Sequence, residues 1–298
     1  MSLTGLQPGT IYYYQVGDGK VWSGTESFTI SNDKETNFFI LGDIQSSDTS
    51  NLAHSLEALK NSKTSYDFAI QTGDAIDNVT EYVKNWRPFL NTVNSKTLSG
   101  VDMIHVMGNH EYYGDANGEI SGALYDLPES AQNSWYKMEY GKVCVVVVNN
   151  GTKLATALAD IAETLTTDCI WRVLVAHEPI YGTESVSATP EIISSIEKAG
   201  FDFVFGGDDH AYARTYPMIG GVKQAEIRQL VVGSPSDVMR LLIKDLRCHF
   251  IAPQLVKQGQ HLFQKAHLLG RLPIHRKLRG RFQQRPLQSQ QLAAVIQR

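Results

Sequence analysis

Short apolar runs alternate with polar loops along most of the chain, and helical spacings of apolar residues lie between them. Buried strands are predicted at 38–41, 68–70, 103–107, 171–176 and 201–205, because each run is short and is followed by Gly or polar residues. Apolar residues spaced by three and four predict helices over about 48–61, 79–93, 154–165 and 190–199, the first with Asp48 as its N-cap. A hairpin that turns at Gly141 is predicted from 135–140 and 143–149. This alternation predicts an α/β fold.

The N-terminal segment has a different pattern, without helical spacing. Strands around a Gly-Asp-Gly turn are predicted at 11–16, 21–22 and 26–30. The spacing of Leu, Pro, Thr and Tyr from Leu6 to Tyr12 resembles the tyrosine corner of fibronectin-type sandwiches, which need about seven strands. We therefore expect residues 1–33 to be the C-terminal part of such a sandwich, so that the chain begins inside a domain. A hairpin that belongs to the following domain is the alternative.

Composition narrows the class of protein. With 298 residues, the chain can bury one large core or two modest ones. Its 42% hydrophobic and 19% charged residues are typical of a folded globular protein, and no apolar run approaches the ~20 residues that span a bilayer. The N-terminus has no basic region followed by an apolar core, so no signal peptide is predicted. Cys144, Cys169 and Cys248 form an odd, widely spaced set, which predicts buried or free thiols.

Charge is divided unevenly along the chain. The chain has 27 basic and 31 acidic residues. After residue 237 there are 12 basic residues and one acidic residue, so residues 1–237 contain 15 basic and 30 acidic residues. The basic segment, residues 238–298, is rich in Gln, and no strand alternation is predicted after Ser236. We interpret this segment as non-native or poorly ordered. A nucleic-acid-binding arm and a native amphipathic segment are the alternatives.

The candidate chemistry lies directly after the predicted strands, in five polar blocks. They are Gly-Asp-Ile-Gln at 42–45, Gly-Asp-Ala-Ile-Asp-Asn at 73–78, Gly-Asn-His-Glu at 108–111, Val-Ala-His at 175–177 and Gly-Asp-Asp-His at 207–210. Because binding groups gather beyond the carboxyl ends of strands in open α/β sheets, these blocks should meet at one edge. They supply Asp, Asn and His side chains, which are oxygen and nitrogen ligands for divalent metals. The set is large enough for two metal ions.

The order of these blocks resembles the calcineurin-type metallophosphoesterase superfamily, and within it the purple-acid-phosphatase-like branch. The resemblance covers about 36–236. It implies a metallophosphoesterase domain at 36–237, folded as a four-layer α/β/β/α sandwich of two mixed sheets and preceded by a β-sandwich. It also implies two divalent ions (Mn, Fe or Zn), and hydrolysis of phosphate monoesters, or else of diesters, by a metal-bound hydroxide.

The resemblance also implies a role for individual residues. The metal ligands would be Asp43, Asp74, Asn109, His177, Asp208 and His210, with Asp74 bridging the two ions. His110 would act on substrate oxygens as a hydrogen-bond donor or an acid, and Glu111 would orient His110 or its loop. Candidates for the substrate pocket are Tyr112, Tyr113, Tyr181, Tyr212 and Arg214.

Three positions depart from the family pattern. Gln45 replaces a His ligand of many members, and Asp77 replaces the Tyr ligand of the purple acid phosphatases, so the protein should not be purple. Either residue could bind metal or support the ligands from behind. Asp208 replaces the first His of the Gly-His-x-His block, and its carboxylate would keep the second metal site with a harder ligand. His105, in the middle of a predicted strand, is expected to be a packing residue.

We therefore predict a dinuclear metal-dependent phosphoesterase. The alternative is a catalytically impaired fragment whose basic tail binds polyanions, since the sandwich is incomplete and Asp208 departs from the pattern. A phosphate ester is the expected partner; no membrane partner is expected, and nucleic acid could bind only through the basic tail. Oligomeric state and localisation are not predicted, although the resemblance is compatible with a secreted or cell-surface parent.

Overall fold

The computed structural model describes residues 5–18, 20–30, 36–62, 65–96, 100–127, 129–182, 186–210, 215, 218–223, 230–232, 240–244 and 247–251. Within this part of the chain, the strands form a five-stranded sheet, a three-stranded sheet and three two-stranded hairpins. None of its helices is both long and apolar enough to cross a bilayer.

The two larger sheets consist mainly of parallel strands. The three-stranded sheet has the order β3 (Phe38–Leu41), β4 (Phe68–Gln71) and β5 (Asp102–His105), all parallel. The five-stranded sheet has the order β12 (Leu230–Val232), β9 (Phe203–Phe205), β8 (Trp171–Ala176), β7 (Val143–Val148) and β6 (Trp135–Tyr140), with only β6 antiparallel to its neighbour. The expectation of two mixed sheets is thus wrong for the described part of the three-stranded sheet.

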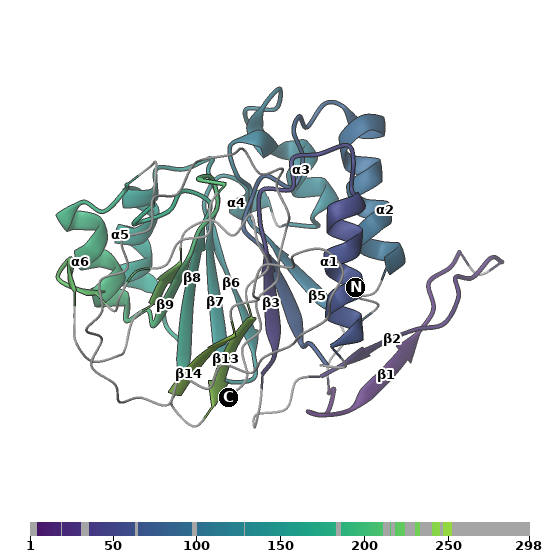
Figure 1. Cartoon of the computed structure of the whole chain (residues 1–298), viewed down its shortest axis with the longest axis horizontal. Helices are drawn as coiled ribbons and strands as arrows, with labels where there is room; N and C mark the ends of the chain where they lie inside the picture. Colours follow the sequence, from purple (N-terminus) through teal and green to yellow (C-terminus); the bar gives the residue numbers. More distant parts are fainter. Residues whose placement is uncertain are drawn as a thin grey trace, which may run out of the picture.

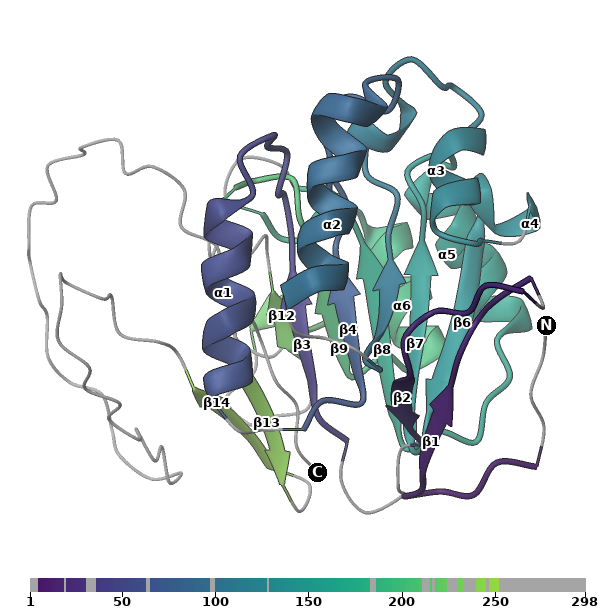
Figure 2. The ribbon, with the colours of Figure 1, turned by 90° about the vertical axis from the view of Figure 1, so that its right-hand side faces the viewer.

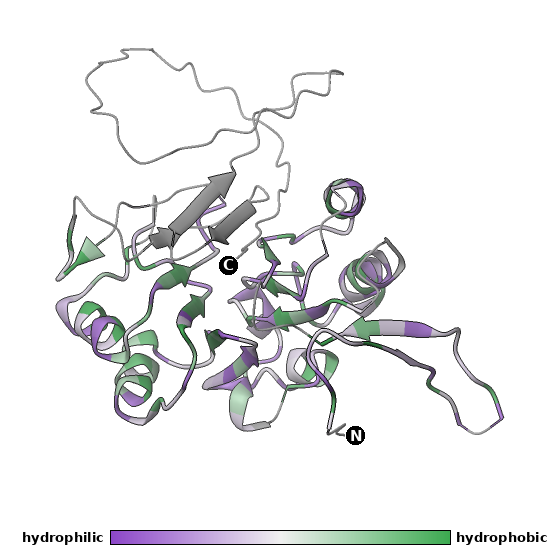
Figure 3. Ribbon diagram, turned by 90° about the horizontal axis from the view of Figure 1, so that it is seen from below, coloured by the Kyte–Doolittle hydropathy of each residue, from purple (hydrophilic) through white to green (hydrophobic). Residues whose placement is uncertain are grey.

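Helices cover the outer faces of both sheets. Helices α1 (Ser50–Asn61) and α2 (Arg87–Lys96) lie beside the three-stranded sheet, and α5 (Leu154–Thr164) and α6 (Pro190–Ala199) lie beside the five-stranded sheet (Figures 1 and 2). A third core lies between the sheets, where Phe38 and Phe68 meet Val145 and Val175. Green and purple residues alternate around the helices in Figure 3, as expected for helices with one buried face.

Several further elements are short. They are the π-helix η1 (Tyr82–Trp86), the 3₁₀ turn η2 (His110–Tyr112), α3 (Glu119–Leu124), α4 (Glu129–Gln132), and the hairpin strands β10 (Met218–Ile219) and β11 (Val222–Lys223).

The predicted helices at 154–165 and 190–199 are confirmed, and two others differ. The helix expected over 79–93 begins with the π-turn η1, because Asn85 Nδ2 donates to Asn78 O (3.1 Å) and Trp86 Nε1 donates to Val79 O (2.9 Å). Helix α1 begins at Ser50, so Asp48 is not its N-cap; the Asp48 carboxylate accepts the Ser50 N–H from outside the helix at 3.0 Å.

Two of the three predicted N-terminal strands are confirmed, as a hairpin of β1 (Ile11–Tyr14) and β2 (Glu26–Thr29). The strand expected at 21–22 is wrong, because only an isolated bridge joins Trp22 to Gly17. The Tyr12 hydroxyl accepts the backbone N–H of Gln7 at 2.9 Å, which is the return contact of a tyrosine corner. Large apolar side chains on this hairpin are exposed, among them Tyr13 and Val21 at 73% and 72%. A two-stranded ribbon with this much exposed apolar surface is marginal by itself.

The prediction that no strands follow Ser236 is wrong. Strands β13 (Arg240–Lys244) and β14 (Arg247–Ile251) form an antiparallel hairpin, and β13 contacts β3. β13 has an apolar centre between Arg240 and Lys244, and β14 ends in Phe250 and Ile251; the high content of Arg and Gln in the whole segment obscured this local pattern. The rest of the segment interpreted as non-native, from residue 252, lies outside the described residues.

The prediction of free or buried thiols is wrong for two cysteines. Cys144 on β7 and Cys169, just before β8, form a disulfide with a Cα–Cα distance of 5.7 Å. Their sequence separation of 25 residues gave no indication of this pairing. Because β7 and β8 are parallel neighbours, the chain that enters β8 passes the start of β7 and brings the two residues together.

Candidate metal centre

The carboxyl ends of the parallel strands meet at the upper edge of the sheets in Figure 1, and polar residues follow each of them. Asp43 lies after β3, Asp74 after β4, His177 after β8 and Asp208 after β9. The loops are joined through their backbones, since Asp43 N donates to Gly73 O (3.2 Å) and Gly207 N donates to His177 O (2.7 Å). The predicted meeting of the polar blocks is therefore observed.

Three buried side chains form the centre of this edge. Asp43, Asp74 and His177 each offer a ligand atom, and these atoms all lie within 4.8 Å of one another. His177 Nε2 lies 3.2 Å from Asp74 Oδ2, and the side chains of His177 and Asp74 are 0% and 2% exposed. Carboxylates are rarely buried without a cation or hydrogen-bond donors, so this set of two oxygens and one nitrogen fits a divalent metal ion.

The backbone around the cluster is strained. Among the described residues, six that are not Gly have positive φ; all but Asp126 belong to the predicted site, namely Asp43, Gln45, Asp74, Asp208 and His210. Left-handed conformations are unfavourable for residues with a side chain and tend to gather at functional sites. This concentration singles out the edge independently of any motif.

Glycines allow the loops to approach the cluster closely. A Cβ on Gly73 would lie 2.4 Å from His177 Nδ1, and a Cβ on Gly108 would lie 2.2 Å from Asp74 Oδ1. Neither position has room for a larger residue. These two glycines are thus required by the geometry of the ligand side chains.

The other three predicted ligands surround this centre. Asn109 Oδ1 and Asp208 Oδ1 lie 3.0 Å and 3.7 Å from His177 Nε2. Asp208 also donates its backbone N–H to Asp43 Oδ1 at 2.8 Å. His210 Nε2 lies 3.7 Å from Asp43 Oδ1 and its side chain is 55% exposed. All six predicted ligands therefore belong to one connected group.

Glu111 joins two of the loops from behind. Its buried carboxylate accepts the backbone N–H groups of Asp74 (2.9 Å), Ala75 (2.9 Å) and Gly108 (2.8 Å), and the hydroxyl of Tyr125 (3.2 Å). The expectation that Glu111 orients its loop fits these contacts. They also extend to the Asp74 loop, which sequence reasoning missed.

His110 lies at the rim of the centre, against the Asp74 and Asp77 loop. Its backbone N–H donates to Asp74 Oδ1 (3.0 Å), and its Nδ1 lies 2.7 Å from the carbonyl oxygen of Asp77. The Asp77 side chain is 55% exposed, with its carboxylate 3.7 Å from the same nitrogen. Gln45 donates from Nε2 to Asp74 Oδ2 at 2.5 Å. In these positions Gln45 and Asp77 contact Asp74 and His110.

Electrostatics in the cluster favour positive charge. Burial lowers the pKa of His177, but the hydrogen bond to Asp74 and the charges of Asp74 and Asp43 outweigh it and raise the pKa to about 10. Burial raises the pKa of Asp74, but the hydrogen bond and charge of His177 and the backbone N–H of His110 together lower it. Burial, helped by the charge of Asp74, raises the pKa of Glu111 to about 7.

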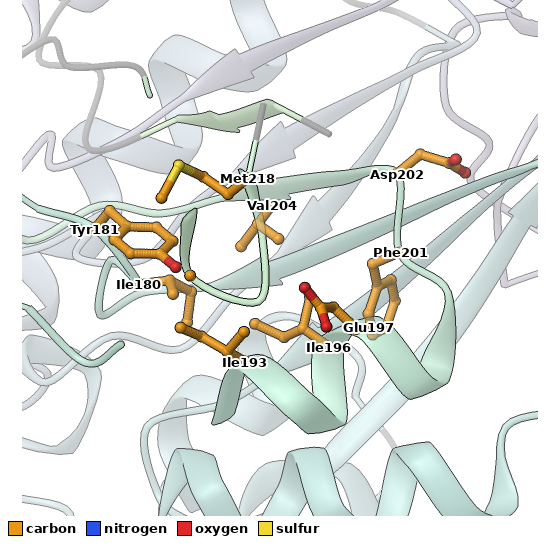
Figure 4. Close-up of a pocket in the computed structure, with 10 residues that line it drawn as sticks. Ile180, Tyr181, Ile193, Ile196, Glu197, Phe201, Asp202, Val204 and Met218 are labelled. Carbon is orange, nitrogen blue, oxygen red and sulfur yellow. The ribbon is translucent and has the colours of Figure 1, made fainter. Parts of the chain in front are cut away.

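The candidates for a substrate pocket lie in different places. Tyr112 packs against the core beside α2, and its hydroxyl donates to Gln132 O. Tyr181 lines a small, mostly apolar cavity of about 20 Å³ between α6 and the β10–β11 hairpin, with Glu197 and Met218 (Figure 4). That volume admits about one water molecule. Tyr212 and Arg214 lie outside the described residues.

A larger cleft escaped the sequence reasoning. It has a volume of about 510 Å³ and lies on the α5 and α6 side of the five-stranded sheet, at the carboxyl ends of β7 and β8. Its polar lining includes Asn150, Lys153 and Glu178, the last directly after His177. The polar blocks of the metal centre include none of these three residues, because the cleft is formed by the ends of two strands and the starts of two helices.

Comparison with protein families gives two matches. The sequence model of the family described as calcineurin-like phosphoesterase matches residues 36–212, which is more than half of the chain. The model of the purple acid phosphatase N-terminal domain matches residues 1–30. No curated protein matches the chain.

Solved structures with a similar fold include two phosphatases. A purple acid phosphatase from seeds of yellow lupin (Lupinus luteus) is 17% identical, with a TM-score of 0.61 over 78% of this chain and 51% of that one. A dimetal phosphatase from Danio rerio is 13% identical, with a TM-score of 0.50 over 66% of this chain and 86% of that one. The chain thus spans about half the length of the lupin enzyme. At these identities the likeness concerns the fold alone.

Proposed function

Because the chain belongs to the calcineurin-like phosphoesterase family, we propose that it hydrolyses phosphate monoesters, or else phosphodiesters, at a centre of two divalent metal ions. The convergence of Asp43, Asp74 and His177 within 4.8 Å carries this proposal. Sequence motifs alone could arise from loops that never meet. Here the three side chains are buried and face one another.

The ligand set fits the metals that the resemblance implies. In the proposed centre Asp43 and His210 would hold one ion, Asn109, His177 and Asp208 would hold the other, and Asp74 would be shared by both. The donors are oxygen and nitrogen without thiolate, which favours Mn, Fe(II) or Zn. When bound, the two ions would activate a water molecule and neutralise charge on the phosphoryl group.

The protein groups around the centre support the rest of the reaction. His110 lies at the rim with Nε2 3.8 Å from Asp74 Oδ2, a position from which it can donate to a substrate oxygen or to the leaving group. Its Nδ1 lies against the Asp77 carbonyl and acts as a donor there, so Nε2 has a proton to donate only when the ring carries both protons, as an imidazolium. Glu111 acts as a positioning residue, since its buried carboxylate accepts three backbone N–H groups of two loops and the Tyr125 hydroxyl.

The alternative proposal is that the chain is a catalytically impaired fragment. The position of Asp208 argues against this alternative. A broken ligand would be expected to turn away from the cluster. Instead, the Asp208 carboxylate lies 3.7 Å from His177 Nε2, and its backbone N–H donates to Asp43. The basic tail of the rival proposal lies, from residue 252, outside the described residues.

We also propose a domain organisation. Residues 36–237 form the phosphoesterase domain as a four-layer α/β/β/α sandwich, supported by helices on the outer face of each sheet and a core between the sheets. Residues 1–33 form the end of a fibronectin-type sandwich, supported by the Tyr12 contact and the exposed apolar side chains of the β1–β2 hairpin. Residues 238–298 are the basic segment of the sequence, of which strand β13 contacts β3.

Metal content and hydrolysis together test the proposed function. The purified chain should contain about two equivalents of Mn, Fe or Zn by elemental analysis. It should hydrolyse p-nitrophenyl phosphate or bis(p-nitrophenyl) phosphate, and a chelator should remove the activity until metal is restored. Less than half an equivalent of metal after reconstitution, without hydrolysis of either ester, would reject the proposal.

A further inference from the structure

Two adjacent tyrosines after the Gly-Asn-His-Glu block have different surroundings. Tyr112 packs against the core, whereas Tyr113 is 47% exposed. Tyr113 follows the 3₁₀ turn η2, and its backbone N–H donates to His110 O at 3.2 Å. This turn brings Tyr113 back over Asn109 and His110, which both belong to the proposed centre.

The Tyr113 hydroxyl is bonded to a proposed metal ligand. Asn109 Nδ2 donates to Tyr113 Oη at 2.8 Å, while Asn109 Oδ1, at the other end of the amide, lies 3.0 Å from His177 Nε2. Only the oxygen of an amide binds a cation. With its nitrogen held by Tyr113, the amide directs its oxygen to the ligand cluster. A flipped amide could still bond the hydroxyl, but its NH₂ group would then face the cations.

The Tyr113 ring contacts a second residue of the centre. Its centroid lies 4.5 Å from that of His110, with an angle of 44° between the planes. The Nδ1 of His110 lies 2.7 Å from the Asp77 carbonyl oxygen. The imidazole is thus held by a polar contact at Nδ1 and by the Tyr113 ring at its face.

We propose that Tyr113 is a positioning residue of the metal centre, whose hydroxyl holds the Asn109 amide with its oxygen toward the metal and whose ring fixes His110. This inference rests on the proposed function. The hydroxyl of Tyr113 acts on Asn109 and its ring acts on His110, so removal of the hydroxyl and removal of the ring have separate effects. Because the side chain is half exposed, its loss has little effect on folding.

The first experiment compares Tyr113→Phe and Tyr113→Leu with the parent, all as full-length chains. Tyr82→Phe is the matched control, because Tyr82 is 49% exposed on the η1 turn. Metal-free proteins are titrated with Mn²⁺ or Zn²⁺ by calorimetry, and their thermal midpoints are measured. Tyr113→Phe should weaken one of the two binding events roughly two- to tenfold, the worth of one hydrogen bond, with an unchanged metal-free midpoint. Tyr113→Leu should weaken the same event and also lower kcat.

A second experiment removes the amide that Tyr113 holds. In an Asn109→Asp background the ligand has two equivalent oxygens, so its orientation no longer depends on the phenol. Adding Tyr113→Phe to Asn109→Asp should therefore leave metal affinity unchanged, a non-additive result. An additive loss in this background would overturn the inference.

The outcomes separate the inference from the proposed function. Equal metal affinity of the parent and Tyr113→Phe, in a parent that binds two ions and hydrolyses a phosphate ester, would overturn the inference alone. A fall in the metal-free midpoint large enough to explain the lost affinity would make Tyr113 part of the scaffold and also overturn it. A parent that binds no metal would overturn the proposed function, and this inference with it.

Discussion

His177 and His105 show how differently two parts of this molecule treat the same side chain. His177, at the carboxyl edge of the sheets, is fully buried between carboxylates, which hold its pKa at about 10 in spite of burial. His105, on β5, stacks on Tyr125 with ring centroids 3.9 Å apart. There burial alone lowers its pKa to about 3. Burial lowers the pKa of both histidines, so the carboxylates around His177 account for the difference between the two pKa values.

The comparison teaches where a cation can be held. His105 Nδ1 is buried without a hydrogen-bond partner among the described residues, and its surroundings exclude positive charge. Around His177, Asp74 and Asp43 create a field that favours a proton, and the same field favours a metal ion in place of that proton. The packing role expected for His105 agrees with its stacking contact.

The largest expected effect is that of Asp74→Asn, which removes the charge nearest His177. A neutral amide cannot bridge two cations well, so kcat on p-nitrophenyl phosphate should fall on the order of a thousandfold or more, about 4 kcal/mol of transition-state stabilisation. Metal content should fall as well. Asp126→Asn is the matched control, because Asp126 also has a positive φ (54°, the same as Asp74). Activity of Asp74→Asn within tenfold of the parent would remove Asp74 from the centre.

A smaller effect is expected at Asp208, whose carboxylate is 35% exposed and farther from His177. Asp208→Ala should lower the metal stoichiometry from about two toward one. Asp208→His should retain two ions and shift the preference toward Zn, because imidazole is a softer ligand than carboxylate. A metal titration of the three proteins measures both. Equal stoichiometry in all three would show that Asp208 is not a ligand, and a sharp gain of activity in Asp208→His would identify it as a broken one.

Next in size is Glu111→Gln, which tests how firmly the loops hold the carboxylates around His177. The Glu111 carboxylate accepts three backbone N–H groups, and an amide would turn a donor toward one of them. One unsatisfied buried group costs about 1–3 kcal/mol, so the thermal midpoint should fall by several degrees and kcat by roughly tenfold. Glu57→Gln, on an exposed position of α1, is the control. An unchanged midpoint with unchanged kcat would contradict the role of Glu111.

The sequence predicted those features that depend on neighbours along the chain. The strand at 171–176 and the helix at 190–199 follow from local apolar patterns, and the candidate ligands after each strand follow from the order of the motifs. Two contacts between distant segments were missed. The Cys144–Cys169 disulfide depends on the pairing of β7 with β8, and the reach of Glu111 to the Asp74 loop depends on the packing of two loops.

Orientation is the other feature that a motif cannot give. Gln45 was open as a ligand, but the structure directs its Nε2 to Asp74 Oδ2, which makes it a hydrogen-bond donor. The contact of Tyr113 with Asn109 likewise depends on the turn at η2. The π-turn at Tyr82–Trp86 was missed because side-chain hydrogen bonds to Asn78 and Val79, which no apolar spacing records, hold the preceding loop.

The smallest expected effect concerns His105 and appears only in acid. Its pKa is about 3 in the folded protein, against about 6.5 when unfolded, so between these values the unfolded state binds more protons. The stability due to a neutral His105 is therefore complete above pH 6.5 and is lost as pH falls toward 3.

His105→Phe keeps a ring against Tyr125 but cannot be protonated. As pH falls from 7 to 4, the free energy of unfolding, measured by denaturant titration, should fall by up to a few kcal/mol more in the parent than in His105→Phe. His54→Gln, on an exposed position of α1, should run parallel to the parent. A constant difference between His105→Phe and the parent across this range would mean that His105 is not held neutral, and the contrast with His177 would fail.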